Sequence, residues 1–451
     1  MTRKPALLLL ALLGTTACPE EGVEPPAPVE VSRVSITVDA AVATILRVGW
    51  SQDAAADGWL EFDLGDGEWR TSPVTARDPG DHEEVILGAP AETDVQIRVV
   101  TDNLGERYTS PIGQGRTGAL PEGMIEPTLD TWVPELLGPE EFVLGSVDPN
   151  GGEEYVGPFW LFIANRAGRV VWYREIGGWV TLFPRPSRDR THIAWERHSL
   201  LDATGELSVL ERATLDGRWT EEISLPGLGW AWDEMDDGTI LYDVARGDES
   251  ATLEEVAPDG TTRTVWDCTA WIEQWAADPD GCYTNTVNWS PERDTVMWST
   301  YWGDWIAEVD RASGEVLWHA GELDGGWTID AEAGLDLQHY PNYSPDGTLV
   351  VSTHVPGEDG EQRAREFVVD DSTQELREIW SYGEGVDGYA KYSGEAVRLA
   401  NGNTLINYGT GGEIREVDLD GTTVWSLKFG LDRTLGHTQL LDDLYELNRG
   451  R

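Results

Sequence analysis

The sequence predicts an all-β protein in which a β-sandwich precedes a six-bladed β-propeller. Between residues 29 and 118, short alternating strands are separated by turns, without the 3.6-residue periodicity of a helix. From about residue 140 onward a hairpin signal recurs six times, and a second strand signal precedes most of its copies. Repeats of this length are typical of propeller blades, each of which is a four-stranded sheet.

The first 17 residues have the features of an export signal. Arg3 and Lys4 precede an apolar stretch that is too short to span a bilayer, and small residues lie directly before Cys18. This arrangement resembles a bacterial lipoprotein signal peptide over residues 1–17, which implies that Cys18 is lipidated and begins the mature chain. An ordinary secretory signal that is cleaved at the same place is the alternative.

The segment 18–28 is rich in Pro and Glu, which is typical of a tether that holds a domain away from a surface. A lipid on Cys18 would anchor the protein in a membrane of the cell envelope. The residue after Cys18 is Pro rather than Asp, which in enteric bacteria would be the signal for retention at the inner membrane. We therefore expect the outer membrane, on its periplasmic or its outer side.

Acidic residues dominate the charged composition. There are 82 Asp and Glu against 32 Lys and Arg, which gives a formal net charge of −50. Such a surface repels nucleic acid, so a DNA- or RNA-binding function is excluded. It also disfavours anionic small molecules, unless a local cationic pocket overrides the field. The acidic shell by itself fits adaptation to salt and does not require a functional site.

Residues 29–118 are interpreted as the sandwich. The strand at Val48-Gly49-Trp50 would place a tryptophan in the core, and the segment ends at Thr117-Gly118. In these features it resembles a fibronectin type III module, a kind of domain that usually acts as a spacer. Residues 119–139 follow as a linker, and residues 140–451 form the propeller.

The three cysteines divide into one candidate for lipidation and one pair. In an exported protein, Cys268 and Cys282 are expected to form a disulfide, and closing a loop of about 15 residues stabilises by about 3 kcal/mol in the chain-entropy model. A metal site is not expected, because neither cysteine belongs to a CxxC pair and no histidine has ligand spacing to them.

Each propeller unit contains an acidic residue, a tight turn and, a few residues later, a tryptophan. In the copy at Asp420-Gly421, for example, the tryptophan is Trp425. Asp-Gly pairs favour hairpin turns, and the tryptophan would pack the outer strands of a blade together. The turns lie about 43 to 60 residues apart, at Gly168, Gly217, Gly260, Gly314, Thr373 and Gly421.

A second turn signal marks the inner strands of the blades. Residues at equal offsets before equivalent turns face the same end of a propeller channel, so they nominate a site. The nominated residues are Trp230, His339 and Gly394, each eight residues before a turn glycine, and Asn285 with Tyr283 in the intervening blade.

Three motifs of the repeat region carry a family resemblance. They are Gln338-His339 before the turn at Gly347, the segment 399–405 (LANGNTL), and the segment 308–318. Over roughly residues 30–447 they resemble the bacterial arylsulfotransferase family. That family combines a β-sandwich with a six-bladed propeller. It transfers a sulfuryl group from a phenolic sulfate ester to another phenol through a sulfated histidine, without a nucleotide sulfate donor, so no cofactor is expected.

The resemblance implies that His339 is the catalytic nucleophile, because it matches the histidine of the family's Gln-His pattern. The donor would be a phenolic small molecule. The residues expected to bind it are Gln338, Tyr283, Asn285, Tyr301, Trp230 and Lys391.

The sequence departs from the family at most of the site. The family's His-His-Asp pattern falls on the segment 229–231 (GWA), another histidine falls on Tyr283, and an arginine falls on Tyr301. Sulfuryl transfer develops negative charge that positioned cations stabilise. Lys391 and Arg398 are the cations nominated to take over this task.

A non-catalytic propeller is the second hypothesis. Aromatic residues would then make the channel mouth a binding site for a neutral aromatic molecule, a sugar or a protein partner of unknown kind. A cation within about 6 Å of His339 would favour transfer, whereas neutral, aromatic surroundings would favour binding. The other histidines, including His354 and His437, are interpreted as structural. The aromatic candidates are Trp230, Trp232, Tyr283, Tyr301, Trp302 and Tyr340.

Overall fold

The structure is a computed structural model. It describes residues 26–151, 155–177, 180–198, 207–245, 251–275, 279–330, 334–355, 360–386, 388–430 and 433–450. The predicted signal peptide, Cys18 and most of the tether therefore lie outside the described residues. None of the helices in the described ranges has the length and the apolar character that a membrane crossing requires.

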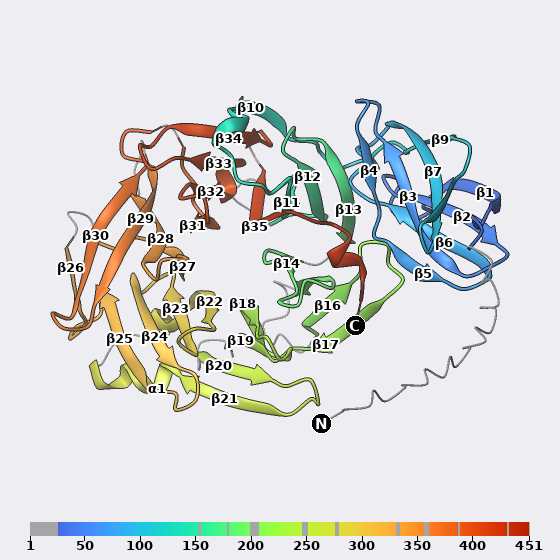
Figure 1. Ribbon diagram of the computed structural model, residues 1–451. Coiled ribbons are helices and arrows are strands. Elements are labelled where there is room, and N and C mark those ends of the chain that lie inside the picture. Colours follow the sequence, from blue (N-terminus) through green and yellow to red (C-terminus); the bar gives the residue numbers. More distant parts are fainter. Residues whose placement is uncertain are drawn as a thin grey trace, which may run out of the picture.

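Two antiparallel sheets form the sandwich that the sequence predicts (Figure 1). Trp50 is buried in its core against Leu60 and Ile97, as the Val48-Gly49-Trp50 strand predicts. One sheet contains β1 (Val31–Val38), β2 (Leu46–Gln52) and β6 (Gly80–Ile86). The other contains β3 (Ala56–Asp63), β4 (Trp69–Thr71), β5 (Thr75–Arg77), β7 (Asp94–Asn103), β8 (Glu106–Thr109) and β9 (Gly113–Arg116).

Six further sheets form a closed ring of blades, which confirms the six-bladed propeller (Figure 1). The first blade contains the C-terminal strand β35 (Thr434–Leu441) as its inner strand, followed by β11 (Phe142–Asp148), β12 (Phe159–Asn165) and β13 (Val170–Gly177). Pairing of β35 with β11 joins the two ends of the propeller sequence and closes the ring.

The other blades follow in chain order, each from its inner to its outer strand. Blade two has β14 (Arg185–Pro186), β15 (Ile193–Arg197), β16 (Val209–Ala213) and β17 (Thr220–Ser224). Blade three has β18 (Leu228–Glu234), β19 (Ile240–Ala245), β20 (Ala251–Val256) and β21 (Thr262–Asp267). Blade four has β22 (Thr284–Ser290), β23 (Thr295–Thr300), β24 (Trp305–Asp310) and β25 (Val316–Gly321).

The last two blades each carry a fifth, outer strand. Blade five has β27 (His339–Tyr343), β28 (Leu349–Val355), β29 (Glu361–Asp370), β30 (Glu375–Tyr382) and, outside them, β26 (Thr328–Asp330). Blade six has β31 (Gly394–Arg398), β32 (Thr404–Tyr408), β33 (Glu413–Val417), β34 (Thr423–Lys428) and β10 (Thr128–Trp132). Because β10 belongs to this sheet, the stretch 119–139 does more than link the two domains.

The repeated tryptophans have a role that the sequence pattern alone did not indicate. The Trp172 indole of blade one donates to the carbonyl of Leu215, 2.8 Å away in the turn of blade two. The Trp380 indole of blade five bonds Leu419 of blade six in the same way, at 3.0 Å. Each of these tryptophans therefore ties its blade to the outer turn of the next blade.

The predicted disulfide is present between Cys268 and Cys282, whose Cα atoms are 5.9 Å apart. Cys268 begins the short helix α1 (Cys268–Ile272), and Asp267 caps that helix by accepting a hydrogen bond from the Ala270 amide. Cys282 ends a 3₁₀ turn (Pro279–Cys282). Both cysteines are buried, so the disulfide holds the segment from α1 to the 3₁₀ turn against blade four.

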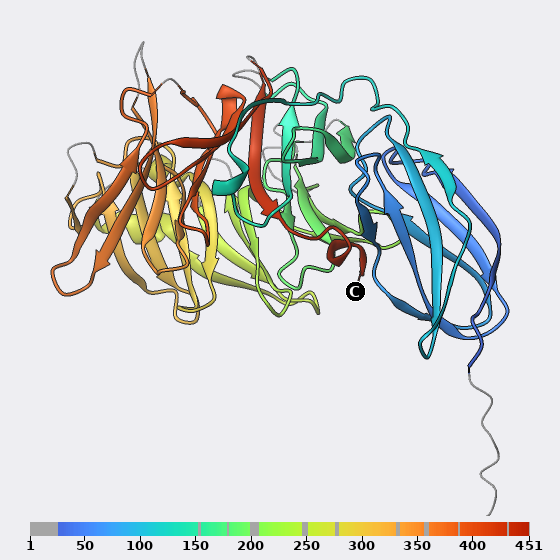
Figure 2. The ribbon, with the colours of Figure 1, turned by 45° about the horizontal axis from the view of Figure 1, so that its top comes forward.

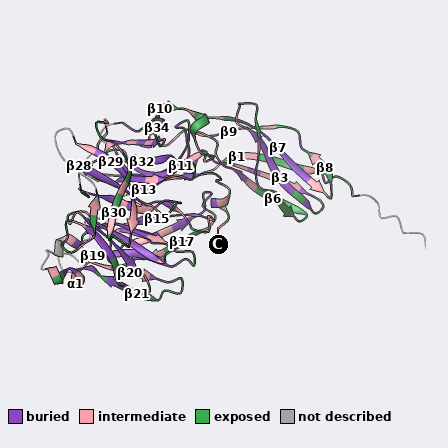
Figure 3. Cartoon of the chain, turned by 60° about the vertical axis from the view of Figure 1, so that its left-hand side comes forward, coloured by how far each residue is buried: buried purple, intermediate pink, exposed green. Residues whose placement is uncertain are grey.

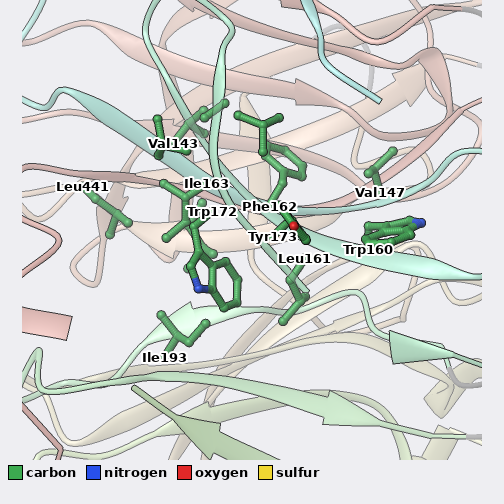
Figure 4. Close-up of a cluster of buried hydrophobic side chains, with 14 of the residues drawn as sticks. Val143, Val147, Trp160, Leu161, Phe162, Ile163, Trp172, Tyr173, Ile193 and Leu441 are labelled. Carbon is green, nitrogen blue, oxygen red and sulfur yellow. The ribbon is translucent and has the colours of Figure 1, made fainter. Parts of the chain in front are cut away.

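Buried apolar side chains fill the spaces between and within the blades (Figure 3). In the first blade, Trp172 packs toward Ile193 of the second blade, as the close-up in Figure 4 shows, whereas the Phe162 ring lies 5.1 Å from Phe429 of blade six. The sandwich lies beside the ring rather than over its channel (Figures 1 and 2). The Ala43 amide of the sandwich donates to the Tyr173 hydroxyl of blade one, at 2.8 Å.

Candidate functional site

A pocket of about 200 Å³ lies at one end of the central channel, where the inner strands begin. All six blades contribute to it, because their inner strands run through the channel in the same direction. Its lining residues are Tyr155, Leu182, Phe183, Trp230, Tyr283, Thr284, Asn285, Thr286, Tyr301, Trp302, His339, Tyr340, Tyr392, Ser393, Gly394, Glu395, Gly436 and His437.

The structure brings together the six residues that the repeat offset and the motif comparison placed at this mouth: Trp230, Tyr283, Asn285, Tyr301, His339 and Gly394. They come from four different blades and are separated by up to about 160 residues of sequence. For Trp230, His339 and Gly394 the convergence follows from the equal spacing between each residue and the turn that ends its inner strand, whereas Tyr283 and Tyr301 meet across the hairpin of blade four, where the Tyr301 amide donates to the Tyr283 carbonyl at 2.9 Å. The offset thus located the pocket, whereas the roles of these residues stay a prediction.

Gln338 does not line the pocket. Its side-chain amide donates to the carbonyls of Thr300, at 2.6 Å, and Trp305, at 2.9 Å, inside blade four. The backbone carbonyl of Gln338 accepts a hydrogen bond of 2.8 Å from the side-chain amide of Asn285. Gln338 therefore fixes the start of β27, and with it the neighbouring His339, rather than facing a ligand.

The two nominated cations also lie elsewhere. Arg398 ends β31, donates to the Gly402 carbonyl at 2.9 Å and pairs with Glu366; it lines a second cavity at the opposite end of the channel. The Lys391 ammonium lies 5.2 Å from the centroid of the Tyr392 ring, outside the residues that line the pocket. Within the described residues, the lining of this pocket therefore contains no Lys or Arg.

His339 is buried, and its Nδ1 lies 2.9 Å from the Leu337 carbonyl oxygen. A carbonyl can only accept, so Nδ1 carries the proton and Nε2 is the basic nitrogen of the neutral ring. Burial lowers the pKa of His339 to about 4, although the Leu337 carbonyl and the Glu395 carboxylate oppose this effect. The ring is therefore uncharged at neutral pH.

His354 lies directly beside His339, although it is not among the residues that line the pocket. The two rings are 4.8 Å apart, and the His354 Nδ1 bonds the Ala390 carbonyl. Burial lowers the pKa of His354 to about 3, so this ring is neutral as well. The register of the β27–β28 hairpin explains this neighbourhood. His339 pairs with Ser352, and His354, two residues further along the strand, lies on the same face of the sheet.

His437 and Glu395 form a second feature that the sequence reasoning missed. The His437 Nδ1 lies 2.9 Å from a Glu395 carboxylate oxygen, and the other oxygen accepts from the Thr438 amide at 3.1 Å. Both side chains line the pocket. The interpretation of His437 as structural did not take into account that ring closure makes β35 an inner strand.

Aromatic rings form most of the remaining wall. Tyr301 contacts His339 at 5.6 Å and Tyr392 at 5.9 Å, and Tyr155 contacts Trp230 at 5.9 Å between ring centroids. Burial and neighbouring phenols raise the pKa of Tyr301 to about 12, so its hydroxyl remains protonated and can donate a hydrogen bond.

Two of the aromatic candidates differ in their placement. Trp302 stands at the rim with 67% of its surface exposed, where a bound molecule can reach it. Trp232 is fully buried and donates its indole N–H to Glu196 at 3.0 Å, so it is a core residue and not a stacking surface of the pocket.

Two buried carboxylates hold the loops of blades two and three. Asp243 accepts from the backbone amides of Trp230, at 2.8 Å, and Ala231, at 2.6 Å. Glu196 accepts from the amides of Leu182 and Phe183. Burial raises the pKa of both carboxyl groups to about 7, because the hydrogen bonds compensate only part of the lost hydration.

No group of three or more His, Cys, Asp and Glu side chains is arranged to hold a metal ion in the part of the chain that the structure describes. The functional groups that the pocket offers are therefore one neutral imidazole, one imidazole–carboxylate pair, an amide and a wall of aromatic rings.

No protein-family model and no curated protein matches the chain. Among solved structures, a streptogramin B lyase is similar at 13% identity with a TM-score of 0.40, over 66% of this chain and 98% of that chain. Hsv2 of Kluyveromyces lactis is similar at 12% identity with a TM-score of 0.36, over 79% of this chain and 95% of that chain. Likenesses this remote carry no functional argument, so the blade assignment rests on the strand topology.

Proposed function

We propose that this protein is a ligand-binding β-propeller, which holds an aromatic small molecule without negative charge at the channel mouth. The aromatic lining around His339, without Lys or Arg among the described lining residues, is the observation that carries the proposal. Apolar and aromatic pockets with a few convergent polar groups are the usual form of small-molecule sites. Tyr301 and Asn285 supply such polar groups here.

The charge around His339 also supports binding over sulfuryl transfer. The negative charge of the Glu395 carboxylate is close enough to His339 to raise the pKa of its ring, against the larger effect of burial. A transferring sulfuryl group would place its negative charge next to this carboxylate, in a protein of net charge −50. Removing one positioned donor or cation from comparable transfer sites commonly costs ~100-fold or more in rate.

Sulfuryl transfer through His339 is the second candidate. What supports it is the neutral ring with a defined tautomer: Nδ1 is held by Leu337, which leaves Nε2 as the nitrogen that could attack sulfur. The sulfuryl group would move from the phenolic oxygen to Nε2, and the phenoxide would leave and take up a proton. Tyr301 could stabilise that phenoxide by a hydrogen bond.

Removing the Trp230 ring tests the binding proposal. Titration with the neutral phenol 3-tert-butylphenol, followed by tryptophan fluorescence, is expected to show saturable binding. Trp230→Leu should weaken it about tenfold or more, because the ring's stacking surface is lost. The matched control is Trp132→Leu on β10, an exposed tryptophan outside the pocket, which should leave the affinity unchanged.

The same protein can be incubated with 4-nitrophenyl sulfate and a phenol acceptor. The binding proposal expects neither nitrophenol release nor a sulfated histidine by mass spectrometry. Turnover that disappears in His339→Ala would instead support the transferase. Binding that is equal in wild type and Trp230→Leu would contradict the proposed site.

We also propose that lipid on Cys18 holds the protein at the cell envelope, at the outer membrane. The export signal and the small residues before Cys18 support this. The wild type should partition into detergent, and Cys18→Ser should be recovered in the aqueous phase, because a lipid anchor would be lost. A Cys18→Ser protein that still fractionates with membranes would contradict the proposal.

A further inference from the structure

We propose that the ligand of this pocket is an organic cation, such as a quaternary or tertiary ammonium group carried on an aromatic ring. This inference rests on the function proposed above and specifies the charge of the ligand. It is carried by two features that meet in the pocket, a lining of aromatic rings and one fixed carboxylate.

The aromatic rings surround the pocket from several blades. Tyr155 and Trp230 form one tilted pair, and Tyr301 and Tyr392 form another, each with 5.9 Å between centroids. The face of an aromatic ring is negative, so a cation within about 6 Å of several ring centroids is attracted by each of them. Such cages are the usual recognition mode for quaternary ammonium groups.

The Glu395 carboxylate supplies the complementary charge. It lines the pocket at 5% exposure, and its two oxygens are held by His437 and by the Thr438 amide. A carboxylate fixed in such surroundings interacts more strongly with a nearby cation than it would in water. An anionic ligand would face the same carboxylate as a repulsive charge.

Two cations of the chain lie near the pocket but outside its lining; one of them, Arg185, stands 5.8 Å from the centroid of the Tyr340 ring and is paired with Asp233 at 2.7 Å. The other cation, Lys391, also lies outside the lining, and its ammonium stands over the Tyr392 ring, 5.2 Å from the ring centroid. Because the Lys391 ammonium would repel a second cation, the attraction has to come from the Glu395 carboxylate and from the other rings. The net charge of −50 raises the concentration of cations and lowers that of anions around the mouth.

Three phenols of nearly equal shape test the inference on the full-length protein. They are 3-hydroxyphenyltrimethylammonium, its uncharged isostere 3-tert-butylphenol, and the anion 3-hydroxybenzenesulfonate. Calorimetric titration at low ionic strength is expected to give a Kd for the cation at least about tenfold below that of the isostere, and the weakest binding for the anion. Added salt should weaken the binding of the cation and leave the binding of 3-tert-butylphenol unchanged, because salt screens only the charged ligand.

A Glu395→Gln variant separates the carboxylate from the rings. The substitution should weaken the binding of the cation at least about fivefold and leave the affinity for 3-tert-butylphenol unchanged, because the amide keeps the shape of the carboxylate but not its charge. Glu68→Gln in the sandwich, an exposed position far from the pocket, is the control for the same change in net charge. Since Glu395 is buried, the wild-type isostere comparison decides the question if the variant does not fold.

Each outcome bears on one of the two proposals. Equal or tighter binding of the uncharged isostere overturns the cation inference and leaves the binding function standing. Tightest binding of the sulfonate overturns the inference and favours the transferase. If neither the cation nor the isostere binds in a manner that depends on Trp230, the binding function itself fails.

Discussion

Arg166→Met should lower the free energy of unfolding by about 3–5 kcal/mol, the range for removing one partner of a buried ion pair. The Arg166 guanidinium lies 2.8 Å from a Glu416 carboxylate oxygen, and the two side chains are 6% and 0% exposed. Without the guanidinium, Glu416 would remain charged and buried, with only neutral donors around it.

The position of this pair adds to the expected effect. Arg166 lies in the turn between β12 and β13 of blade one, whereas Glu416 lies on β33 of blade six. The Arg166 carbonyl also accepts the Trp425 indole N–H at 2.7 Å, and its guanidinium lies 4.6 Å from the centroid of that ring. The substitution therefore weakens the seam at which the propeller ring closes.

Urea unfolding followed by tryptophan fluorescence measures this loss. The control is Arg70→Met, because Arg70 and Asp66 form a pair of 2.6 Å in which both side chains are well exposed, and exposed pairs contribute about 0–1 kcal/mol. Adding Glu416→Gln to Arg166→Met should recover part of the loss, because the uncompensated charge is removed. A loss in Arg166→Met no greater than that in Arg70→Met would contradict the prediction.

Asp243→Asn should stabilise the protein at pH 8 by an amount on the order of 4 kcal/mol, since one pKa unit corresponds to ~1.4 kcal/mol. Burial raises the pKa of Asp243 from 3.8 to about 7 in the folded protein. The folded state therefore prefers the protonated carboxyl. The contribution of Asp243 to the free energy of unfolding is therefore greatest below pH 4 and falls as the pH rises from about 4 to about 7.

Asn resembles the protonated carboxyl group and keeps an oxygen that can accept from the Trp230 and Ala231 amides. The difference between variant and wild type should therefore be small at pH 4, grow up to about pH 7 and stay constant above it. Thermal unfolding across this pH range gives the profile. A variant that is less stable than wild type at pH 8 would show that the charged form is preferred.

The same substitution at a second carboxylate, Asp294, should change the free energy of unfolding in the opposite direction. The side-chain hydrogen bond of Arg311 lowers the pKa of Asp294, so the folded state prefers this carboxyl group in its charged form. Asp294→Asn should therefore destabilise the protein at neutral pH, and the deficit should shrink as the pH falls toward the acidic range. Because the Asp294 side chain is 45% exposed, the effect should be small.

Most of the fold could be predicted from the sequence, because its signals are local. The turn glycines Gly168 and Gly421 have positive φ angles, of 81° and 80°, that suit hairpin turns, and their spacing sets the number of blades. Strand pairing between consecutive segments then follows with little freedom. The cysteine pair was also predictable, since only two cysteines remain after the one at the export signal.

The site was predictable in part. Trp230 and His339 could be placed at one mouth because each precedes its inner turn by the same number of residues. Arg398 could have been excluded by the same geometry: it ends the strand that Gly394 begins, and four residues of strand span about 13 Å. That distance carries Arg398 to the opposite end of the channel.

The sequence by itself determined the β architecture, the blade count and the set of residues at one end of the channel, because these depend on periodicity along the chain. Only the tertiary structure decided which charges face the pocket. Glu366 of blade five binds Arg398, and ring closure brings His437 to Glu395. Such pairings join side chains from different blades, and an electrostatic environment depends on every charge that packing brings near, whatever its distance in sequence.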